Sequence, residues 1–138
     1  MKQLIYRSRP FGFDEAILAS ILMHARRANR ERDIAGALIC RQDMYLQLIE
    51  GPDDAIDALY DRIRVDDRHI EVTLESSRPI TRRMFPEWSM LDDTNPSMTF
   101  SREAVEGGAA ERADAQDMLA IFRRIADRTR ESGRSEKA

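Results

Sequence analysis

Apolar and polar residues alternate along some stretches of the chain and recur every three or four positions along others. Residues 2–7 alternate, which predicts a strand with Leu4 and Tyr6 on one face and Ile5 on the other. Residues 14–30 change to a helical period, with two acidic residues in the first turn, where they suit the helix dipole. The chain is therefore predicted to begin with a strand and a helix.

Two short apolar runs, residues 34–40 and 44–50, follow the first helix with a turn of three residues between them. This arrangement is typical of a β-hairpin. A proline and two aspartates then introduce residues 52–66, in which apolar residues recur at spacings of three and four, so a second amphipathic helix is predicted. Residues 70–74 alternate again and predict a fourth strand.

A fifth strand is predicted within residues 85–91, with Trp88 and Met90 on one of its faces. The resulting order, βαββαββ, predicts a ferredoxin-like fold in the α+β class. We expect a mixed sheet of five strands with two helices on one face. C-terminal helices are expected to cover the other face, because a helical stripe of apolar residues follows a Gly-Gly break. The members of this stripe are Met118, Leu119, Phe122 and Ile125.

The length of the chain suits one domain with a substantial core and a smaller appendage. It has 138 residues, which we divide into a main domain (residues 1–95) and a C-terminal helical extension (residues 96–130). The remaining residues, 131–138, are polar, and we expect them to be disordered.

Charge and cysteine content argue against several classes of protein. The chain has 22 basic and 25 acidic residues and a net charge of -3, so it lacks the positive pole that recruits nucleic acid. The single cysteine, Cys40, excludes an internal disulfide, and no metal-ligand spacing is present. Since no leader is found and no apolar run approaches the ~20 residues of a membrane span, we expect a cytoplasmic protein.

Three polar side chains occur at positions where apolar ones are expected. Gln47 lies within the apolar third strand. Asn29 continues the apolar stripe of the first helix at a spacing of four, and Tyr6 shares a strand face with Leu4. An unpaired buried polar group costs about 1 to 3 kcal/mol, so these groups must bond to one another, to water or to a ligand. Singly, Tyr6 suits a core tyrosine and Asn29 a helix cap, but together the three favour a planar ligand with polar edges.

Five segments, in consecutive order, resemble the BLUF domain, a sensor of blue light that uses flavin. They are QLIYRSR, ARRANRERDIAGALI, YLQLIEGP, LYDRIRVDDRHIEV and PITRRMFPEWSM, and the match as a whole runs from about Lys2 to Met90. The resemblance includes the spacing from asparagine to glutamine and blocks similar to LEG and RRxFxxWxM. It implies a photoreceptor and not an enzyme, which binds FAD non-covalently, with FMN and riboflavin as alternatives.

The resemblance also implies roles for individual residues. Tyr6 is similar to the family's redox-active tyrosine, and Gln47 to the glutamine between that tyrosine and the N5 and C4 carbonyl edge of the flavin. Blue light is then expected to drive electron and proton transfer from Tyr6 and to leave Gln47 rotated or tautomerised in a red-shifted signalling state. Asn29 matches the asparagine that clamps the pyrimidine end of the ring. Trp88 and Met90 match a strand-five pair that competes for the space beside the glutamine.

Other matched positions are expected to hold the rest of the cofactor. At the end of the second helix, Arg62, Asp66 and His69 match positions that line the sugar and phosphate tail of the flavin. An alternative is that Arg62 and Asp66 form a surface ion pair at i and i+4, and that His69 is a solvated loop residue. The apolar neighbours of the ring are expected to be Ile21, Ala25 and Ile63.

The sequence departs from the family pattern at two positions. Ala28 replaces a side chain that often bonds the flavin, and Ala35 replaces a frequent threonine. Both changes predict weaker flavin retention or altered dark recovery. They also favour an alternative function, a flavin-free dimerisation or adaptor module. A small enzyme of this fold is a third alternative, but the chain has no Ser/His/Asp or Cys/His set and no glycine-rich phosphate loop.

The segment after the matched region is too short for a catalytic output domain. We therefore expect the signal to pass through the C-terminal helices to an unidentified downstream protein, or to change a homo-oligomer that is a dimer or larger. Direct contact with nucleic acid or with a membrane is not expected.

Overall fold

The computed structural model of the chain describes residues 1–10, 15–41, 44–65, 69–93 and 114–131. Its elements, in chain order, are β1 (Lys2–Pro10), α1 (Glu15–Glu31), β2 (Ala35–Arg41), β3 (Met44–Gly51), α2 (Asp53–Arg64), β4 (His69–Pro79), β5 (Leu91–Asp93) and α5 (Ala115–Glu131). The strands and helices from β1 to β5 follow the order that the sequence predicts.

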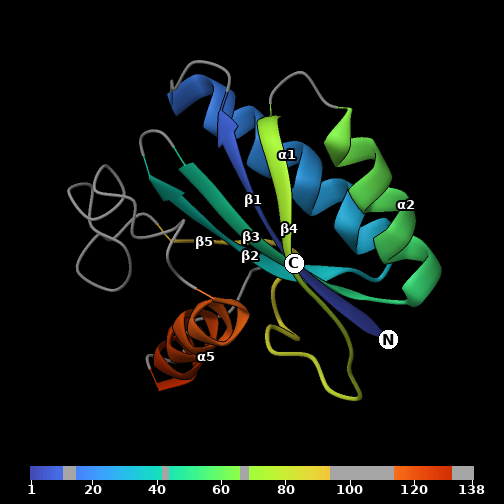
Figure 1. Cartoon of the computed structure of the whole chain (residues 1–138), viewed down its shortest axis with the longest axis vertical. Coiled ribbons are helices and arrows are strands. Elements are labelled where there is room, and N and C mark those ends of the chain that lie inside the picture. The colour runs from blue at the N-terminus through green and yellow to red at the C-terminus, as the bar shows by residue number, and fades with distance from the viewer. Residues whose placement is uncertain (11–14, 42–43, 66–68, 94–113, 132–138) are drawn as a thin grey trace.

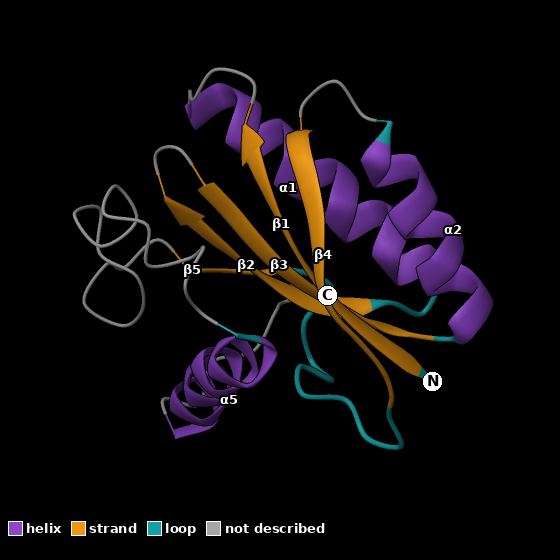
Figure 2. Cartoon of the chain, in the orientation of Figure 1, coloured by secondary structure: helices purple, strands orange, loops and turns teal. Residues whose placement is uncertain are grey.

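The strands form one five-stranded sheet in the order β4-β1-β3-β2-β5. Neighbouring strands are antiparallel except β2 and β5, which are parallel, so the sheet is mixed. Helices α1 and α2 cover one face of the sheet, and α5 lies against the other (Figure 1; Figure 2). The predicted ferredoxin-like α+β fold is confirmed.

The layer between the sheet and the helices α1 and α2 follows from the alternation of side chains along the strands. Leu4 and Tyr6 of β1 and Ile49 of β3 point into this layer, where they meet Ile21 of α1 and Ile63 of α2. Each apolar side chain of this size that is fully buried contributes roughly 1.5 to 3 kcal/mol through the hydrophobic effect. This layer also contains the cavity described below.

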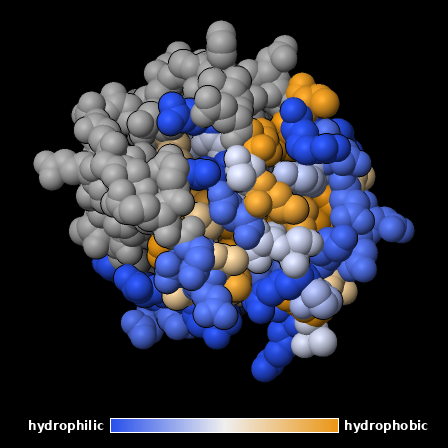
Figure 3. Space-filling model, in the orientation of Figure 1, coloured by the Kyte–Doolittle hydropathy of each residue, from blue (hydrophilic) through white to orange (hydrophobic). Residues whose placement is uncertain are grey.

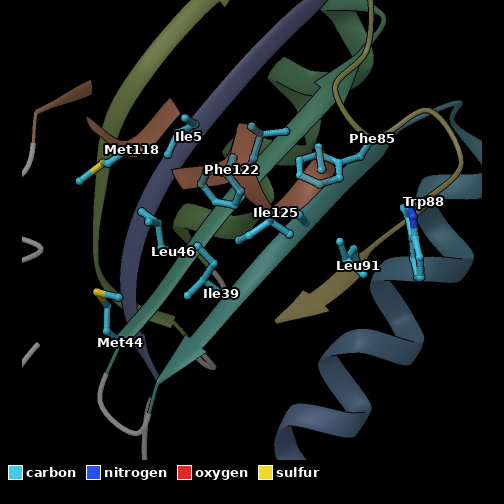
Figure 4. Packing of buried hydrophobic residues seen from close by; sticks show 13 residues of the cluster. Ile5, Ile39, Met44, Leu46, Phe85, Trp88, Leu91, Met118, Phe122 and Ile125 are labelled. Atoms are coloured by element: carbon cyan, nitrogen blue, oxygen red, sulfur yellow. The ribbon is translucent and has the colours of Figure 1, made fainter. Parts of the chain in front are cut away.

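Helix α5 buries its apolar stripe against the opposite face of the sheet. Met118, Phe122 and Ile125 belong to one buried cluster with Ile5 of β1 and Leu46 of β3 (Figure 4). The first turn of α5 has a reciprocal cap, because the carboxylates at positions 114 and 117 each accept a hydrogen bond from the other residue's backbone N–H. The predicted cover for this face is thus confirmed for α5.

Several predictions concern residues that lie outside the described part of the chain. One is the turn of the predicted hairpin (residues 42–43). The others are the first part of the C-terminal extension with its Gly-Gly break (residues 96–113) and the tail after residue 131. None of the described helices combines the length and apolar character that crossing a membrane requires.

The fifth strand begins later than the sequence pattern indicates. β5 begins at Leu91, so Trp88 and Met90 precede it, and the prediction that they share a face of strand five is wrong. Trp88 is buried in the α5 layer, whereas Met90 is buried in the α1 and α2 layer. The backbone before β5 is irregular. Pro86 has no N–H to donate to a neighbouring strand, and Trp88 O accepts a hydrogen bond from Gly36 N at 3.0 Å outside the regular β2–β5 pairing.

A buried carboxylate, Glu50 at the end of β3, fixes the segment that leads to β5. Glu50 is 0% exposed and accepts hydrogen bonds from Met84 N at 3.0 Å and Phe85 N at 2.7 Å. It also accepts one from Gln3 Nε2 at 2.9 Å. Hydrogen bonds to a charged acceptor are stronger than neutral ones, so Glu50 fixes the start of this irregular segment.

Candidate functional site

Tyr6 and Gln47 are brought together by the register of the two central strands. The two residues are direct partners in the antiparallel pairing of β1 and β3, so their side chains lie side by side on the α1 and α2 face. The Tyr6 hydroxyl donates a hydrogen bond to Gln47 Oε1. Tyr6 is 0% exposed and Gln47 is 5% exposed, so this bond is shielded from water.

The other end of the Gln47 amide contacts Met90. Gln47 Nε2 lies 3.5 Å from Met90 Sδ, which is a weak acceptor. Gln47 therefore accepts from Tyr6 and donates to Met90, and it links the central strand to the segment before β5. Of the two residues expected beside Gln47, the structure places Met90 in contact with it.

Helix α1 holds the backbone of the same segment with two side chains. Asn29 Nδ2 donates to Ser89 O at 2.7 Å, and Arg26 Nε donates to Met90 O at 3.1 Å. Asn29 is 1% exposed and lines the cavity described next. Within the described residues, its Oδ1 has no hydrogen-bond partner. Asn29 therefore holds the segment with its amide nitrogen and leaves its amide oxygen available to a ligand.

The side chain of Asn29 does not cap α1. The helix ends with Asp33 in the left-handed region, at φ 61°, and Ile34 N donates to the backbone oxygen of Asn29 at 2.8 Å. This is the bond pattern in which a left-handed residue terminates a helix. Arg83 fixes this end, because its Nη2 donates to Asp33 O at 2.7 Å. The alternative role of Asn29 as a helix cap is therefore wrong.

A cavity of about 230 Å³ lies between α1, α2 and the sheet. Its inner wall is polar and consists of Tyr6, Asn29 and Gln47. Its apolar walls come from the two helices and consist of Ile21, Ala25, Ala28, Leu59 and Ile63. Exposed basic groups stand at its mouth, namely His24, Arg32 and Arg62. The cavity thus combines a narrow apolar slot, a polar end and a cationic entrance.

A second tyrosine, Tyr60 of α2, lies close to Tyr6. The two ring centroids are 5.8 Å apart, and the Arg64 guanidinium lies 5.7 Å from the Tyr60 ring. Burial raises the pKa of the Tyr60 hydroxyl, while the positive charge of Arg64 acts in the opposite direction. Tyr60 therefore stays neutral across the physiological range, and within the described part of the chain it lies beside Tyr6 without a hydrogen bond to Gln47.

Seven of the predicted site residues line this one cavity. No single sequence motif could show that they lie together. They are Tyr6, Ile21, Ala25, Asn29, Gln47, Arg62 and Ile63. Met90 contacts Gln47 from the adjoining segment, and Trp88 lies in the α5 layer instead. Asp66 is outside the described residues, and His69 is placed only as the first residue of β4.

The two departures from the family pattern occupy different environments. Ala28 lines the cavity, so a longer side chain here is able to reach a ligand. Ala35 is buried in β2, where it pairs with Glu50, and it is not among the lining residues. Of the two alanines, Ala28 is the one whose small size bears directly on the cavity.

Five residues of this region were not assigned to the site from the sequence, and one of them is His24, which lines the cavity. Leu59 is one helical turn before Ile63, and Arg32 is three positions after Asn29, so their spacing was an available signal. Arg26 and Ser89 had no such signal, because the bonds that involve them join α1 to an irregular segment about sixty residues away. Among the described residues, no cluster of His, Cys, Asp and Glu is suited to hold a metal ion.

Comparison with known proteins identifies a family for most of the chain. A family model described as "BLUF: Sensors of blue-light using FAD" matches residues 1–91. The photoactivated adenylate cyclase subunit beta of Euglena gracilis is 38% identical over 78 residues, which are 56% of this chain and 9% of that protein. The chain thus spans only about a tenth of the length of the curated relatives that it matches.

Solved structures show the same fold. The dark-state structure of BlrB, a BLUF protein, is 31% identical, with a TM-score of 0.78 over 92% of this chain and 96% of that one. The structure of a bacterial light-regulated adenylyl cyclase is 26% identical, with a TM-score of 0.64 over 93% of this chain and 35% of that one. The first likeness covers nearly the whole of both chains, and the second covers one part of a larger protein.

Proposed function

The chain belongs to the BLUF family of flavin-binding sensors of blue light, and from this premise we propose that Tyr6, Gln47 and Met90 are its light-responsive unit. The observation that carries the proposal is a continuous set of contacts at the inner wall of the cavity. Tyr6 donates to Gln47, and Gln47 donates to Met90. The family is one of sensor domains, so the activity proposed is light detection and not catalysis.

The residues around the cavity fit a flavin. A flavin ring is planar and apolar on its faces and has hydrogen-bonding groups along one edge, which suits a slot with Ala25 and Ile63 at its sides and amides at its end. The Oδ1 of Asn29, which has no hydrogen-bond partner among the described residues, can accept from a ring N–H. Arg32 and Arg62 at the mouth are suited to a phosphate-bearing tail.

We propose FAD as the bound flavin, in preference to FMN or riboflavin. The family description names FAD, and two arginines at the mouth suit a diphosphate better than a flavin without phosphate. We also retain Asp66 and His69 as proposed contacts to the tail. Release of the cofactor by denaturation, followed by chromatography against the three flavins, tests the choice, and recovery of FMN or riboflavin alone would refute it.

The bound flavin supplies blue-light absorption and an acceptor for an electron and a proton. Tyr6 is the proposed donor, because its hydroxyl is buried and donates a hydrogen bond to Gln47 Oε1. Gln47 is placed to respond, because its amide has two ends of similar shape and opposite hydrogen-bonding sense. Turning the amide over converts Tyr6 from a donor into an acceptor and presents an oxygen to Met90 Sδ, which has no proton to donate.

The contact with Met90 makes this rearrangement able to reach the backbone. With the amide turned over, the 3.5 Å contact from Gln47 Nε2 to Met90 Sδ is replaced by a contact between two acceptors, which is unfavourable. Met90 must then move relative to Gln47, and its backbone oxygen carries the bond from Arg26. The segment before β5 is therefore the proposed first stage of output.

The Gln47→Leu variant tests the role of Gln47. Leucine is similar in size but has no donor or acceptor, so we expect the variant to bind flavin and to show no red-shifted state after blue light. The measurement is the visible absorption spectrum before and after illumination, with the ratio of flavin to protein as the control for binding. A normal red shift with normal recovery would remove Gln47 from the mechanism.

The Tyr6→Phe variant tests the electron and proton donor separately. We expect flavin binding and loss of the light-induced shift, because phenylalanine has no hydroxyl to release a proton to Gln47. Tyr60→Phe is the matched control, since Tyr60 lies beside Tyr6 and is not bonded to Gln47 in the structure. If Tyr6→Phe kept the shift, or if both variants lost it equally, Tyr6 would not be the specific donor.

We propose that the signal passes to a downstream protein, through the segment before β5 and the α5 layer beside it. In the relatives, a region like this chain is part of much longer proteins named as adenylate cyclases. We also propose a cytoplasmic location, and a homo-oligomer whose assembly responds to light. Light scattering of dark and illuminated protein at one concentration tests the proposed homo-oligomer, and a monomer mass in both states would refute it.

A further inference from the structure

A second cavity, distinct from the flavin cavity, lies between α5 and the loop that follows β4. It has a volume of about 790 Å³ and shares no lining residue with the first cavity. α5 and this loop lie in the lower half of Figure 1, and hydrophilic residues predominate along the lower margin of Figure 3. We call this cavity the arginine groove, after the residue type that dominates its lining.

Five arginines line the arginine groove, and no acidic residue does. Two of them are neutralised from outside it, Arg83 by Asp33 at 3.0 Å and Arg130 by Asp127 at 3.4 Å. The N-terminal ammonium of Met1 is likewise 3.5 Å from a carboxylate, that of Asp53. The remaining three have no carboxylate partner within the described residues, and they are Arg78, Arg82 and Arg123.

The wall that carries these arginines is held in place by hydrogen bonds. Glu50 accepts from the backbone N–H of Met84, and Arg130 Nη2 donates to Met84 O at 3.0 Å. Arg78 Nε donates to Gln3 Oε1 at 2.8 Å, which orients a guanidinium without cancelling its charge. Glu50 itself is 0% exposed, accepts from three N–H donors and does not line the groove. The groove is thus a preformed concave surface with excess positive charge.

We propose that the arginine groove binds a small molecule that carries two or more phosphate groups. A planar guanidinium matches two phosphate oxygens at once, and three unneutralised guanidinium groups from three segments converge on one hollow. The volume lies within the range of roughly 300 to 1,000 Å³ that small-molecule sites occupy. An extended acidic peptide suits it less, because the arginines surround a hollow and do not follow a line. The excess of positive charge is confined to the groove, since the whole chain has a net charge of -3.

Inorganic pyrophosphate is the probe for this site, titrated calorimetrically into the full chain in the dark. We expect saturable binding that weakens as salt is raised, because the ligand and the guanidinium groups attract through charge. Arg82→Gln and Arg123→Gln should each weaken binding roughly tenfold, the loss expected for one charged hydrogen-bonding partner. The flavin content of each variant should be unchanged, since neither residue lines the flavin cavity.

Arg124→Gln is the matched control. Arg124 is an exposed arginine next to Arg123 on α5, it lines neither cavity, and it has no ion pair within the described part of the chain. Arg124→Gln should change the affinity for pyrophosphate by less than about twofold, because it removes one positive charge at a position outside the groove. Both groove residues are on the surface, so their substitution is not expected to prevent folding.

Three results would overturn the proposal. The first is absence of pyrophosphate binding at millimolar concentration. The second is binding that Arg82→Gln and Arg123→Gln leave intact, or that Arg124→Gln weakens equally, because the anion is then bound elsewhere or by general charge. The third is tighter binding of an oligoglutamate peptide than of pyrophosphate with the same arginine dependence, which would identify the groove as a docking site for an acidic protein segment.

Discussion

The Glu50→Gln substitution replaces one oxygen of a buried carboxylate with an NH₂ group. This carboxylate holds the segment before β5. Glu50 Oε1 accepts from Gln3 Nε2 at 2.9 Å and from Met84 N at 3.0 Å, while Oε2 accepts from Phe85 N at 2.7 Å. A glutamine has one oxygen and one NH₂ group, so it cannot accept from both sides. In its best orientation it keeps the two bonds to Oε1 and turns an N–H toward the N–H of Phe85.

The size of the expected loss follows from these three bonds. One hydrogen bond to a charged acceptor is lost, which removes about 1.5 to 3 kcal/mol, and a buried Phe85 N–H is left unsatisfied at about 1 to 3 kcal/mol. The two bonds that remain become neutral and weaker. Part of this loss is offset, because a carboxamide is easier to bury than a carboxylate. We expect Glu50→Gln to lower the free energy of unfolding by about 2 to 4 kcal/mol.

Urea unfolding followed by tryptophan fluorescence measures this difference, because Trp88 is the only tryptophan in the chain. Glu87→Gln is the control, since Glu87 is exposed in the same segment and should change stability by less than about 0.5 kcal/mol. A Glu50→Gln loss as small as that of the control would refute the reasoning, because it would mean that the carboxylate does not hold Met84 and Phe85 in solution.

Three further predictions concern other parts of the fold and the cavity. Gly36→Ala places a Cβ against the backbone oxygen of Leu48, so we expect a loss of about 1 to 3 kcal/mol in urea unfolding, and an unchanged midpoint would contradict this packing. Ala28→Asn adds a donor to the cavity wall and should lower the Kd for flavin about threefold to tenfold, as measured by flavin fluorescence, whereas unchanged or weaker binding would place position 28 out of reach. Burial raises the pKa of Tyr60 above 10.0, so its tyrosinate absorbance should appear at higher pH than that of a free tyrosine, with Tyr60→Phe as reference. The stability that this neutral group provides is present below about pH 10 and is lost as the pH rises through the raised pKa, and a titration at the free value would refute the burial effect.

The shared layer of Tyr6 and Gln47 was accessible from the sequence through strand alternation, while their direct contact was implied only by the family resemblance. Alternation fixes the face of each strand residue, so parity alone predicts that Tyr6 and Gln47 face the same buried layer, whereas the register that makes them direct partners comes from the β1–β3 pairing in the structure. Asn29 reached the same layer through its spacing of four from Ala25. Periodic elements place their side chains by rules that a single sequence reveals.

The segment from Met84 to Met90 was not accessible in the same way. It has no period, and its position depends on hydrogen bonds from residues far away in sequence, above all Glu50 and Asn29. The sequence therefore predicted a strand that starts too early and put Trp88 and Met90 on one face. Glu50 did leave a signal, because it shares its parity with Leu46 and Leu48 and is a carboxylate on a buried face, just as Gln47 is an amide on the other.

The two faces of the sheet hold this segment by different kinds of contact. On the α5 side, Glu50 of β3 accepts hydrogen bonds from the backbone N–H groups at the start of the segment, and these bonds do not involve the Gln47 side chain. From the α1 and α2 layer, Asn29 and Arg26 bind the carbonyl groups at its end, beside the Met90 side chain that touches Gln47. A change at Gln47 therefore acts on the end of the segment while its start stays fixed, so we expect the intervening residues to bend or turn. Trp88 is one of these residues and is buried against the α5 layer, which makes that layer the surface where a change at the flavin is expected to become detectable to a partner.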